Sequence, residues 1–209
     1  MIYRLCTLWA DIWFFLIFIH HRNYYEQVPD KNKQYIFVGN HISYLDAPII
    51  VKTMQQHIRV LGKIEMGKVP LFGFIYRNAI VTVDRSSAEN RAKSVRILKS
   101  VVNKGISIFI FPEGTFNMTG QPLKEFYDGA FRIAIESQIP IKPVLFLDSY
   151  ERMHYGTLLS LNPGRSRSVF LEEISVEGLT SRDVDTLKQK VYDVMDKKLR
   201  EYKATWIHF

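Results

Sequence analysis

The feature that most constrains this chain is a repeated alternation, from residue 35 onward, of short apolar runs with longer segments of helical apolar spacing. The short runs have strand length, and we expect strands at residues 35–38, 58–62, 80–83, 106–111, 141–146 and 168–172. The longer segments predict helices at residues 45–54, 71–77, 88–103, 130–138 and 184–202. This alternation predicts an α/β fold with a central, largely parallel sheet flanked by helices.

The size of the chain fits one layered unit of this kind. Its 209 residues suffice for one substantial core, and we assign residues 23–209 to a single domain. Thr180 and Asp183 have the spacing of a capping box at the start of the last expected helix. The apolar residues of that helix fall on one stripe that we expect in the core, namely Val184, Leu187, Val191, Met195, Leu199 and Tyr202.

Residues 1–22 form an N-terminal segment of different composition. Positions 5–19 are apolar except for Thr7 and Asp11, and basic residues stand at both ends. A membrane-spanning helix needs about 20 apolar residues, so this run is too short, and it has no small-residue cleavage site of a secretory signal. We predict a helix that lies in the membrane interface, with burial in the core as the alternative. Residues 23–34 are polar and predict a linker.

Composition limits the partners and the chemistry. The formal net charge of +7 suits a polyanion, whether nucleic acid, an anionic bilayer surface or a phosphorylated substrate. No nucleic-acid-binding signature accompanies that charge, and we expect no nucleic-acid partner. Cys6 is the only cysteine, so neither an intrachain disulfide nor a thiolate metal cage can form. The histidines show no metal-ligand spacing, and we expect no metal.

Candidate chemistry begins after the first expected strand, where His41 is followed five positions later by Asp46. Imidazole titrates near neutral pH, and a carboxylate on its far nitrogen fixes the tautomer and stabilises the imidazolium. His41 and Asp46 therefore fit a general base and its orienting partner. Positions five apart on one helix would point about 140° away from each other, so a turn must separate them. The alternative is a surface histidine beside a helix-capping aspartate.

Three further blocks follow in order: Val83-Asp84-Arg85, then Phe111-Pro112-Glu113-Gly114-Thr115, then Ile139-Pro140-Ile141-Lys142-Pro143-Val144. Together with the stretch from His41 to Asp46, this ordered set resembles the glycerolipid acyltransferase family, whose best-known members are the 1-acylglycerol-3-phosphate acyltransferases. The resemblance runs from about residue 35 to about residue 146 and implies that family's fold.

The resemblance implies direct acyl transfer, in which the hydroxyl of an acceptor attacks an acyl thioester and His41 takes its proton. The expected donor is acyl-coenzyme A or an acylated acyl carrier protein, and no cofactor is expected. Arg85 would hold a phosphate, unless it pairs with Asp84 or Glu89 on the surface. The complete set of expected substrate-binding residues is Arg85, Glu113, Gly114, Thr115 and Lys63.

Two departures from the family pattern leave the acceptor open. Phe116 stands where the family commonly has arginine, and the candidates to replace that cation are Lys63, which follows an expected strand, and Lys124 or Arg77. Residues 126–130 lack the lysines that many relatives carry before the glycine. An acyltransferase for another lyso-lipid, such as an acylated amino-acid lipid, and a catalytically silent lipid-binding module are the alternatives. A serine hydrolase is disfavoured, because residues 105–109 fail the GxSxG pattern and Ser43 is interpreted as a turn residue.

We therefore predict an acyltransferase that converts 1-acylglycerol-3-phosphate to phosphatidate. Residues 1–22 would attach it to the cytoplasmic face of the inner or plasma membrane. The expected partners are the membrane surface, a lysophospholipid, and acyl-coenzyme A or an acyl carrier protein.

Overall fold

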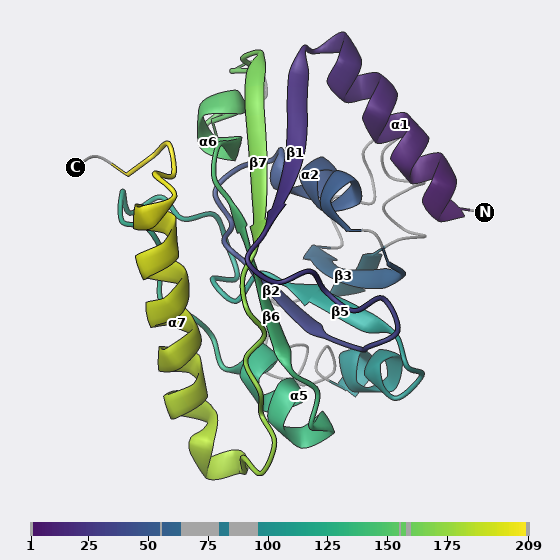
Figure 1. Cartoon of the computed structure of the whole chain (residues 1–209), viewed down its shortest axis with the longest axis vertical. Coiled ribbons are helices and arrows are strands. Elements are labelled where there is room, and N and C mark those ends of the chain that lie inside the picture. The colour runs from purple at the N-terminus through teal and green to yellow at the C-terminus, as the bar shows by residue number, and fades with distance from the viewer. Residues whose placement is uncertain are drawn as a thin grey trace.

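The computed structural model describes residues 2–54, 56–63, 80–83, 96–154, 156–157 and 160–207. Over these residues a seven-stranded sheet runs through the molecule, with helices packed on both faces (Figure 1). The strands are β1 Ile19–Tyr25, β2 Ile36–Gly39, β3 Ile58–Lys63, β4 Ile80–Val83, β5 Ser107–Ile110, β6 Ile141–Phe146 and β7 Gly164–Phe170. The helices are α1 Ile2–Leu16, α2 Asp46–Thr53, α5 Gly129–Ser137, α6 Ser149–Arg152, the 3₁₀ turn η2 Ser181–Asp183 and α7 Val184–Glu201, and residues 96–102 are also helical.

The sheet is mostly parallel. Its order is β1-β7-β6-β2-β5-β3-β4, and every neighbouring pair is parallel except β6 and β7. The five consecutive strands from β6 to β4 therefore run in one direction, and their carboxyl ends share one edge. Open α/β sheets bind their ligands outside that edge. The predicted α/β fold with a central, largely parallel sheet is confirmed.

The N-terminal segment differs from the prediction. α1 ends at Leu16, and the expected helix over residues 1–22 is wrong for the residues that follow, because β1 begins at Ile19. β1 pairs in parallel with β7 along its whole length, so part of the expected linker over residues 23–34 is also strand. The sequence of β1 is polar and lacks a strand pattern. Its backbone partners come from β7, far away in sequence, and only the folded chain supplies them.

The other expected elements lie close to the observed ones. β7 spans Gly164–Phe170, a few residues before the predicted 168–172, and the remaining described strands match to within a residue or so. Of the expected helix 88–103, residues 96–102 are described and helical. The expected helix 71–77 lies outside the described residues.

Side chains that alternate along the strands belong to two hydrophobic clusters, one on each face of the sheet. On β2, Ile36 and Val38 join the cluster covered by α5 and α7, whereas Phe37 joins the cluster covered by α1 and α2. Figure 1 accordingly shows α7 and α1 on opposite sides of the sheet. Burial on both faces explains why the central strands are continuous apolar runs in the sequence.

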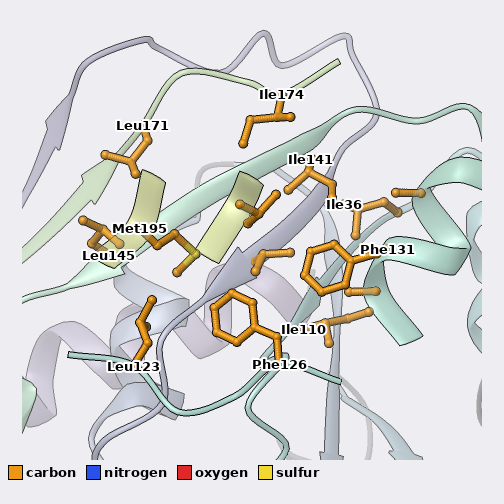
Figure 2. Close-up of a cluster of buried hydrophobic side chains, with 14 of the residues drawn as sticks. Ile36, Ile110, Leu123, Phe126, Phe131, Ile141, Leu145, Leu171, Ile174 and Met195 are labelled. Carbon is orange, nitrogen blue, oxygen red and sulfur yellow. The ribbon is translucent and has the colours of Figure 1, made fainter. Parts of the chain in front are cut away.

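α7 covers one face with the stripe that the sequence predicted. Val184, Leu187, Val191, Met195 and Leu199 are all buried. Figure 2 shows Met195 beside Leu145 of β6, and two residues that follow β7, Leu171 and Ile174, belong to the same cluster. Each such side chain contributes about 1.5–3 kcal/mol when it is fully buried. The expected capping box between Thr180 and Asp183 is present in η2 and starts this helix.

α1 has one face on the protein and one face exposed. Cys6, Ala10 and Phe14 are buried at helical spacing, and Phe14 belongs to the cluster that α1 and α2 cover. Asp11 forms an ion pair with Lys52 of α2. The opposite face exposes large apolar side chains, namely Leu8, Ile12, Phe15 and Leu16. No helix among the described residues is long and apolar enough to cross a bilayer.

Lys142 is a fully buried lysine on β6, in the interior of the sheet. Its Nζ donates a hydrogen bond of 2.5 Å to Oε1 of Gln27. Burial lowers the pKa of Lys142 to about 8, although the nearby carboxylates of Glu173 and Glu172 oppose that shift. The folded protein therefore favours the neutral amine more than the unfolded chain does.

Lys142→Met should stabilise the protein near pH 7 by about 1–3 kcal/mol, because a polar group with one hydrogen bond leaves the core. Between pH 8 and 10.5 the wild-type unfolded chain holds a proton that folded Lys142 has lost, so its free energy of unfolding should rise with pH. The variant should lack that rise. Urea unfolding across this pH range measures both effects.

Lys104→Met is the matched control, because Lys104 is exposed. It should keep the wild-type dependence on pH and the wild-type stability at pH 7. Parallel pH profiles for the wild type and Lys142→Met would show that Lys142 is protonated alike in the folded and unfolded states, against our expectation.

Candidate active site

The sheet gathers the motif-bearing segments at one edge. β2, β5, β3 and β4 are consecutive neighbours, and the segments that follow β2 and β5 carry His41 and Glu113. Lys63 is the last residue of β3, but its side chain lies outside the described part of the chain. Arg85 follows the end of β4 and also lies outside the described residues. The fold thus brings to one edge of the sheet segments that are far apart in the sequence.

His41 and Asp46 form the hydrogen bond that their spacing predicts. His41 Nδ1 lies 2.9 Å from Asp46 Oδ2, and the expected turn separates the two residues. The imidazole side chain is 22% exposed, whereas the Asp46 side chain is fully enclosed. With Nδ1 held by the carboxylate, Nε2 is the ring nitrogen left to exchange a proton with a substrate.

Asp46 is fixed by its own backbone surroundings. It begins α2, and its Oδ2 also accepts hydrogen bonds from the backbone N–H groups of Ile42 and Ser43 at 2.8 and 2.9 Å. A carboxylate in the first turn of a helix is further stabilised by the helix dipole. Pro48 fits the same turn, because an N–H at that position would have no partner within the helix. The carboxylate that orients His41 is therefore rigidly placed.

Ser43 lies beside the pair but is not available as a nucleophile. It is fully buried, its Oγ donates to the carbonyl of Met153 at 2.5 Å, and it accepts from the N–H of Leu45 at 2.9 Å. The hydroxyl proton points away from His41. Ser43 is the turn residue that the sequence indicated.

Two aromatic rings contact the imidazole, and a third packs behind one of them. His41 stacks on Phe111 with 4.0 Å between ring centroids, and Phe116 approaches edge-on at 4.4 Å. Tyr44 in turn contacts Phe116 edge-on at 4.8 Å. The ring of His41 is thus held between a carboxylate and an apolar wall. Phe116, noted from the sequence only as a departure from the family pattern, is part of this wall.

Glu113 holds the main chain of the site together. Its Oε1 accepts from the backbone N–H of His41 at 2.7 Å, and its Oε2 accepts from the backbone N–H of Lys124 at 2.8 Å. The residue has no exposed surface, and burial raises the pKa of its carboxyl to about 8. Both carboxyl oxygens are occupied by backbone N–H groups and enclosed, and the expectation that Glu113 binds substrate stays a prediction. Its place is that of a positioning residue.

Gly114 and Thr115 lie at the rim of the site. Gly114 has φ of 71°, a left-handed conformation that favours glycine, and it turns the chain after Glu113. Thr115 is exposed, and its Oγ1 accepts a hydrogen bond of 2.9 Å from Lys124 Nζ. Thr115 and Lys124 therefore form a hydrogen-bonded pair of polar side chains at the rim.

Two asparagines support the site, and neither was predicted from the sequence to have a role. Asn40 is buried and exchanges hydrogen bonds with the backbone of Phe146 at 2.8 and 3.0 Å, which continues the pairing of β2 with β6 up to His41. The N–H of Asn117 donates to the carbonyl of His41 at 2.7 Å. Their only sequence signal is a polar amide next to a motif residue.

The described residues contain no group of three or more histidine, cysteine, aspartate or glutamate side chains that could hold a metal ion. The geometry on hand is that of a base, its orienting carboxylate and a loop with an exposed hydroxyl and ammonium. That arrangement can take a proton from an alcohol and bind an anionic group nearby.

Comparison with known proteins identifies the family. The sequence model of the family described as Acyltransferase matches residues 17–147, which is more than half of the chain. The chain belongs to this acyltransferase family. It is 30% identical to the 1-acyl-sn-glycerol-3-phosphate acyltransferase of Haemophilus influenzae over 183 residues, covering 84% of this chain and 73% of that protein. It is also 30% identical over 182 residues to an uncharacterized acyltransferase of Schizosaccharomyces pombe, of which it spans 64%.

A solved structure shows the same fold. The crystal structure of the 1-acyl-sn-glycerophosphate acyltransferase PlsC from Thermotoga maritima superposes with a TM-score of 0.79 at 22% identity, covering 99% of this chain and 81% of that one. A putative 1-acyl-sn-glycerol-3-phosphate acyltransferase of Caenorhabditis elegans is 32% identical over 77% of this chain, which spans 57% of its length.

Glu113→Gln should lower kcat by about 10- to 100-fold, because the amide turns an N–H toward one of the two backbone N–H groups and lets His41 shift. The same loss should cost about 1–3 kcal/mol of unfolding free energy. The KM for the acyl donor should change little. Steady-state kinetics and urea unfolding give these quantities.

Glu125→Gln serves as the matched control, since Glu125 is an exposed carboxylate in the same loop. Its kinetics and stability should equal those of the wild type. If Glu113→Gln behaved like this control, the buried carboxyl would have no part in positioning His41.

Proposed function

We propose that the protein transfers a fatty acyl group from an acyl thioester to the free sn-2 hydroxyl of 1-acylglycerol-3-phosphate, giving phosphatidate. The observation that carries the proposal is the His41–Asp46 hydrogen bond at the carboxyl edge of the sheet. Membership of the acyltransferase family supports it, as do relatives named 1-acyl-sn-glycerol-3-phosphate acyltransferase. The product would enter phospholipid synthesis.

The proposed step needs one proton acceptor and one nucleophile, which is the substrate itself. Nε2 of His41 takes the proton of the sn-2 hydroxyl while the oxygen of that hydroxyl bonds to the thioester carbonyl carbon. The tetrahedral intermediate then expels the thiolate, which takes the proton back from the imidazolium. Asp46 stabilises that imidazolium through Nδ1. The products are phosphatidate and the free thiol of coenzyme A or acyl carrier protein.

The surroundings of the base suit a lipid acceptor. Phe111, Phe116 and Tyr44 make an apolar wall next to the imidazole, where the glycerol backbone and the start of an acyl chain would lie. Exclusion of water from such a wall would also limit hydrolysis of the thioester. Arg85, on the family resemblance, and Lys63, from its place at the end of β3, remain our candidates for the acceptor's phosphate. No cofactor is required by the scheme.

We also propose that the exposed face of α1 attaches the protein to the cytoplasmic surface of a membrane. Leu8, Ile12, Phe15 and Leu16 are between 52% and 78% exposed and lie on one side of the helix. The charge of Asp11 does not oppose this arrangement, because Lys52 pairs with it. An apolar face of this size inserts into the interface between head groups and acyl chains. The lipid acceptor would then be reached from the membrane in which it resides.

The decisive assay follows thioester consumption by the full chain in detergent with different acceptors. Lysophosphatidate should support turnover, whereas glycerol 3-phosphate, an acylated amino acid and buffer alone should not. Turnover only with another acceptor would show that the substrate is a different molecule, while the acyl-transfer reaction would be retained. Thioester loss without an acceptor would contradict acyl transfer and indicate hydrolysis.

His41→Ala should lower kcat by about 10²- to 10⁴-fold, the usual contribution of a positioned base. The circular dichroism spectrum should stay that of the wild type. His57→Ala is the control, because His57 is exposed at the opposite edge of the sheet, just before β3. Activity of His41→Ala within a few-fold of this control would remove His41 from the mechanism.

Replacing both Ile12 and Phe15 by aspartate should weaken binding to vesicles of mixed neutral and anionic phospholipid by about 10-fold or more, because two large apolar side chains lose their lipid contact. Cosedimentation of the full chain with vesicles measures this. Val28→Asp is the control, since Val28 is 68% exposed but lies away from α1. Equal binding of the double variant and the control would exclude α1 as the attachment site.

A further inference from the structure

Lys124 places an ammonium group beside the candidate active site. Its Nζ donates to Thr115 Oγ1 at 2.9 Å, and its backbone N–H donates to Glu113 Oε2 at 2.8 Å. The side chain therefore folds back over the loop that follows β5. Two contacts, one from each end of the residue, hold it there.

The same loop touches the base directly. Phe116, next to Thr115, contacts the imidazole of His41 at 4.4 Å, and the N–H of Asn117 donates to the His41 carbonyl at 2.7 Å. The hydroxyl of Thr115 and the ammonium of Lys124 consequently lie at the rim of the site that contains His41.

Glu113 links the backbone of His41 to the backbone of Lys124. One carboxyl oxygen holds the backbone of His41 and the other holds the backbone of Lys124. Because Glu113 is fully buried, this bridge has little freedom. The backbones of His41 and Lys124 are therefore kept at a constant separation. A substrate whose hydroxyl must meet the base while its anionic group meets the ammonium requires such a separation.

The charge of Lys124 is available to a ligand. The ion pairs within the described part of the chain do not include it. An ammonium has three donors, and Thr115 takes one of them. A phosphate oxygen could accept from Lys124 and from the Thr115 hydroxyl together.

We propose that Lys124 and Thr115 bind the phosphate of the acyl acceptor while its free hydroxyl faces His41. The inference rests on the proposed function. Thr115 was already expected to bind substrate, and the structure places beside it Lys124, a cation outside the family pattern. Phosphate groups are also present in coenzyme A. We assign the acceptor because Glu113 ties this lysine to the base that must meet the acceptor's hydroxyl.

The first test is kinetic and uses the full chain in detergent. Lys124→Met keeps the backbone bond to Glu113 and removes only the ammonium. It should raise the KM for lysophosphatidate by about 10-fold or more, the usual effect of losing a charge-assisted hydrogen bond, and leave the KM for the thioester within about twofold. Lys124→Arg should stay within about threefold of the wild type for both. Lys104→Met, at an exposed lysine near the other edge of the sheet, should have no effect.

A rise in the KM for the thioester alone would overturn the assignment, because the lysine would then serve the donor. Equal changes for Lys124→Met and Lys104→Met would also overturn it.

The second test measures binding without turnover. Wild type and Lys104→Met should bind lysophosphatidate more tightly than the matching 1-acylglycerol, which lacks the phosphate, and Lys124→Met should lose that preference. Equal binding of the two lipids by the wild type, or a preference retained in Lys124→Met, would overturn the proposal. The wild type could prefer lysophosphatidate, lose that preference in Lys124→Met, and yet catalyse no acyl transfer. That combination would support the phosphate site and overturn the proposed function instead.

Discussion

The buried carboxyl group of Glu113 is the constraint on which the site depends. It bridges two segments that the chain brings together from far apart, the turn after β2 and the loop after β5. Without it, the backbone N–H groups of His41 and Lys124 would lose a buried acceptor, and each such loss is costly. Burial raises the pKa of this carboxyl to about 8, because its charged form has no water around it. The contacts that the structure shows for this group hold the main chain of the site in place.

The sheet makes this bridge possible. β2 and β5 are adjacent and parallel, so their carboxyl ends open at the same edge and deliver their loops to one place. The two hydrophobic clusters on either face keep those strands in register. On one face α7 and α5 close the core, and on the other α2 both covers the sheet and begins with Asp46. The helix that supplies burial thus also supplies the carboxylate that orients the base.

In the proposed complex, apolar and charged groups of the site would bind different parts of the substrate. Aromatic rings enclose the imidazole, while the ammonium of Lys124 and the hydroxyl of Thr115 stand at the rim. A lysophospholipid has the same division, with an acyl chain, a reactive hydroxyl and an anionic head group. The exposed apolar face of α1 would place this site next to the membrane that holds such a lipid. Phe116 packs against the base, and in the proposed complex the ammonium of Lys124 would supply the charge.

The sequence by itself determined whatever depends on neighbouring residues and on periodicity. The apolar runs predicted most of the strands, the stripe of α7 predicted its buried face, and the spacing from His41 to Asp46 predicted their contact, because a single turn decides it. Only the tertiary structure decided the rest. β1 is a strand because β7 pairs with it, and Glu113 faces inward because two distant N–H groups meet there. Those partners are remote in sequence, so no local pattern records them.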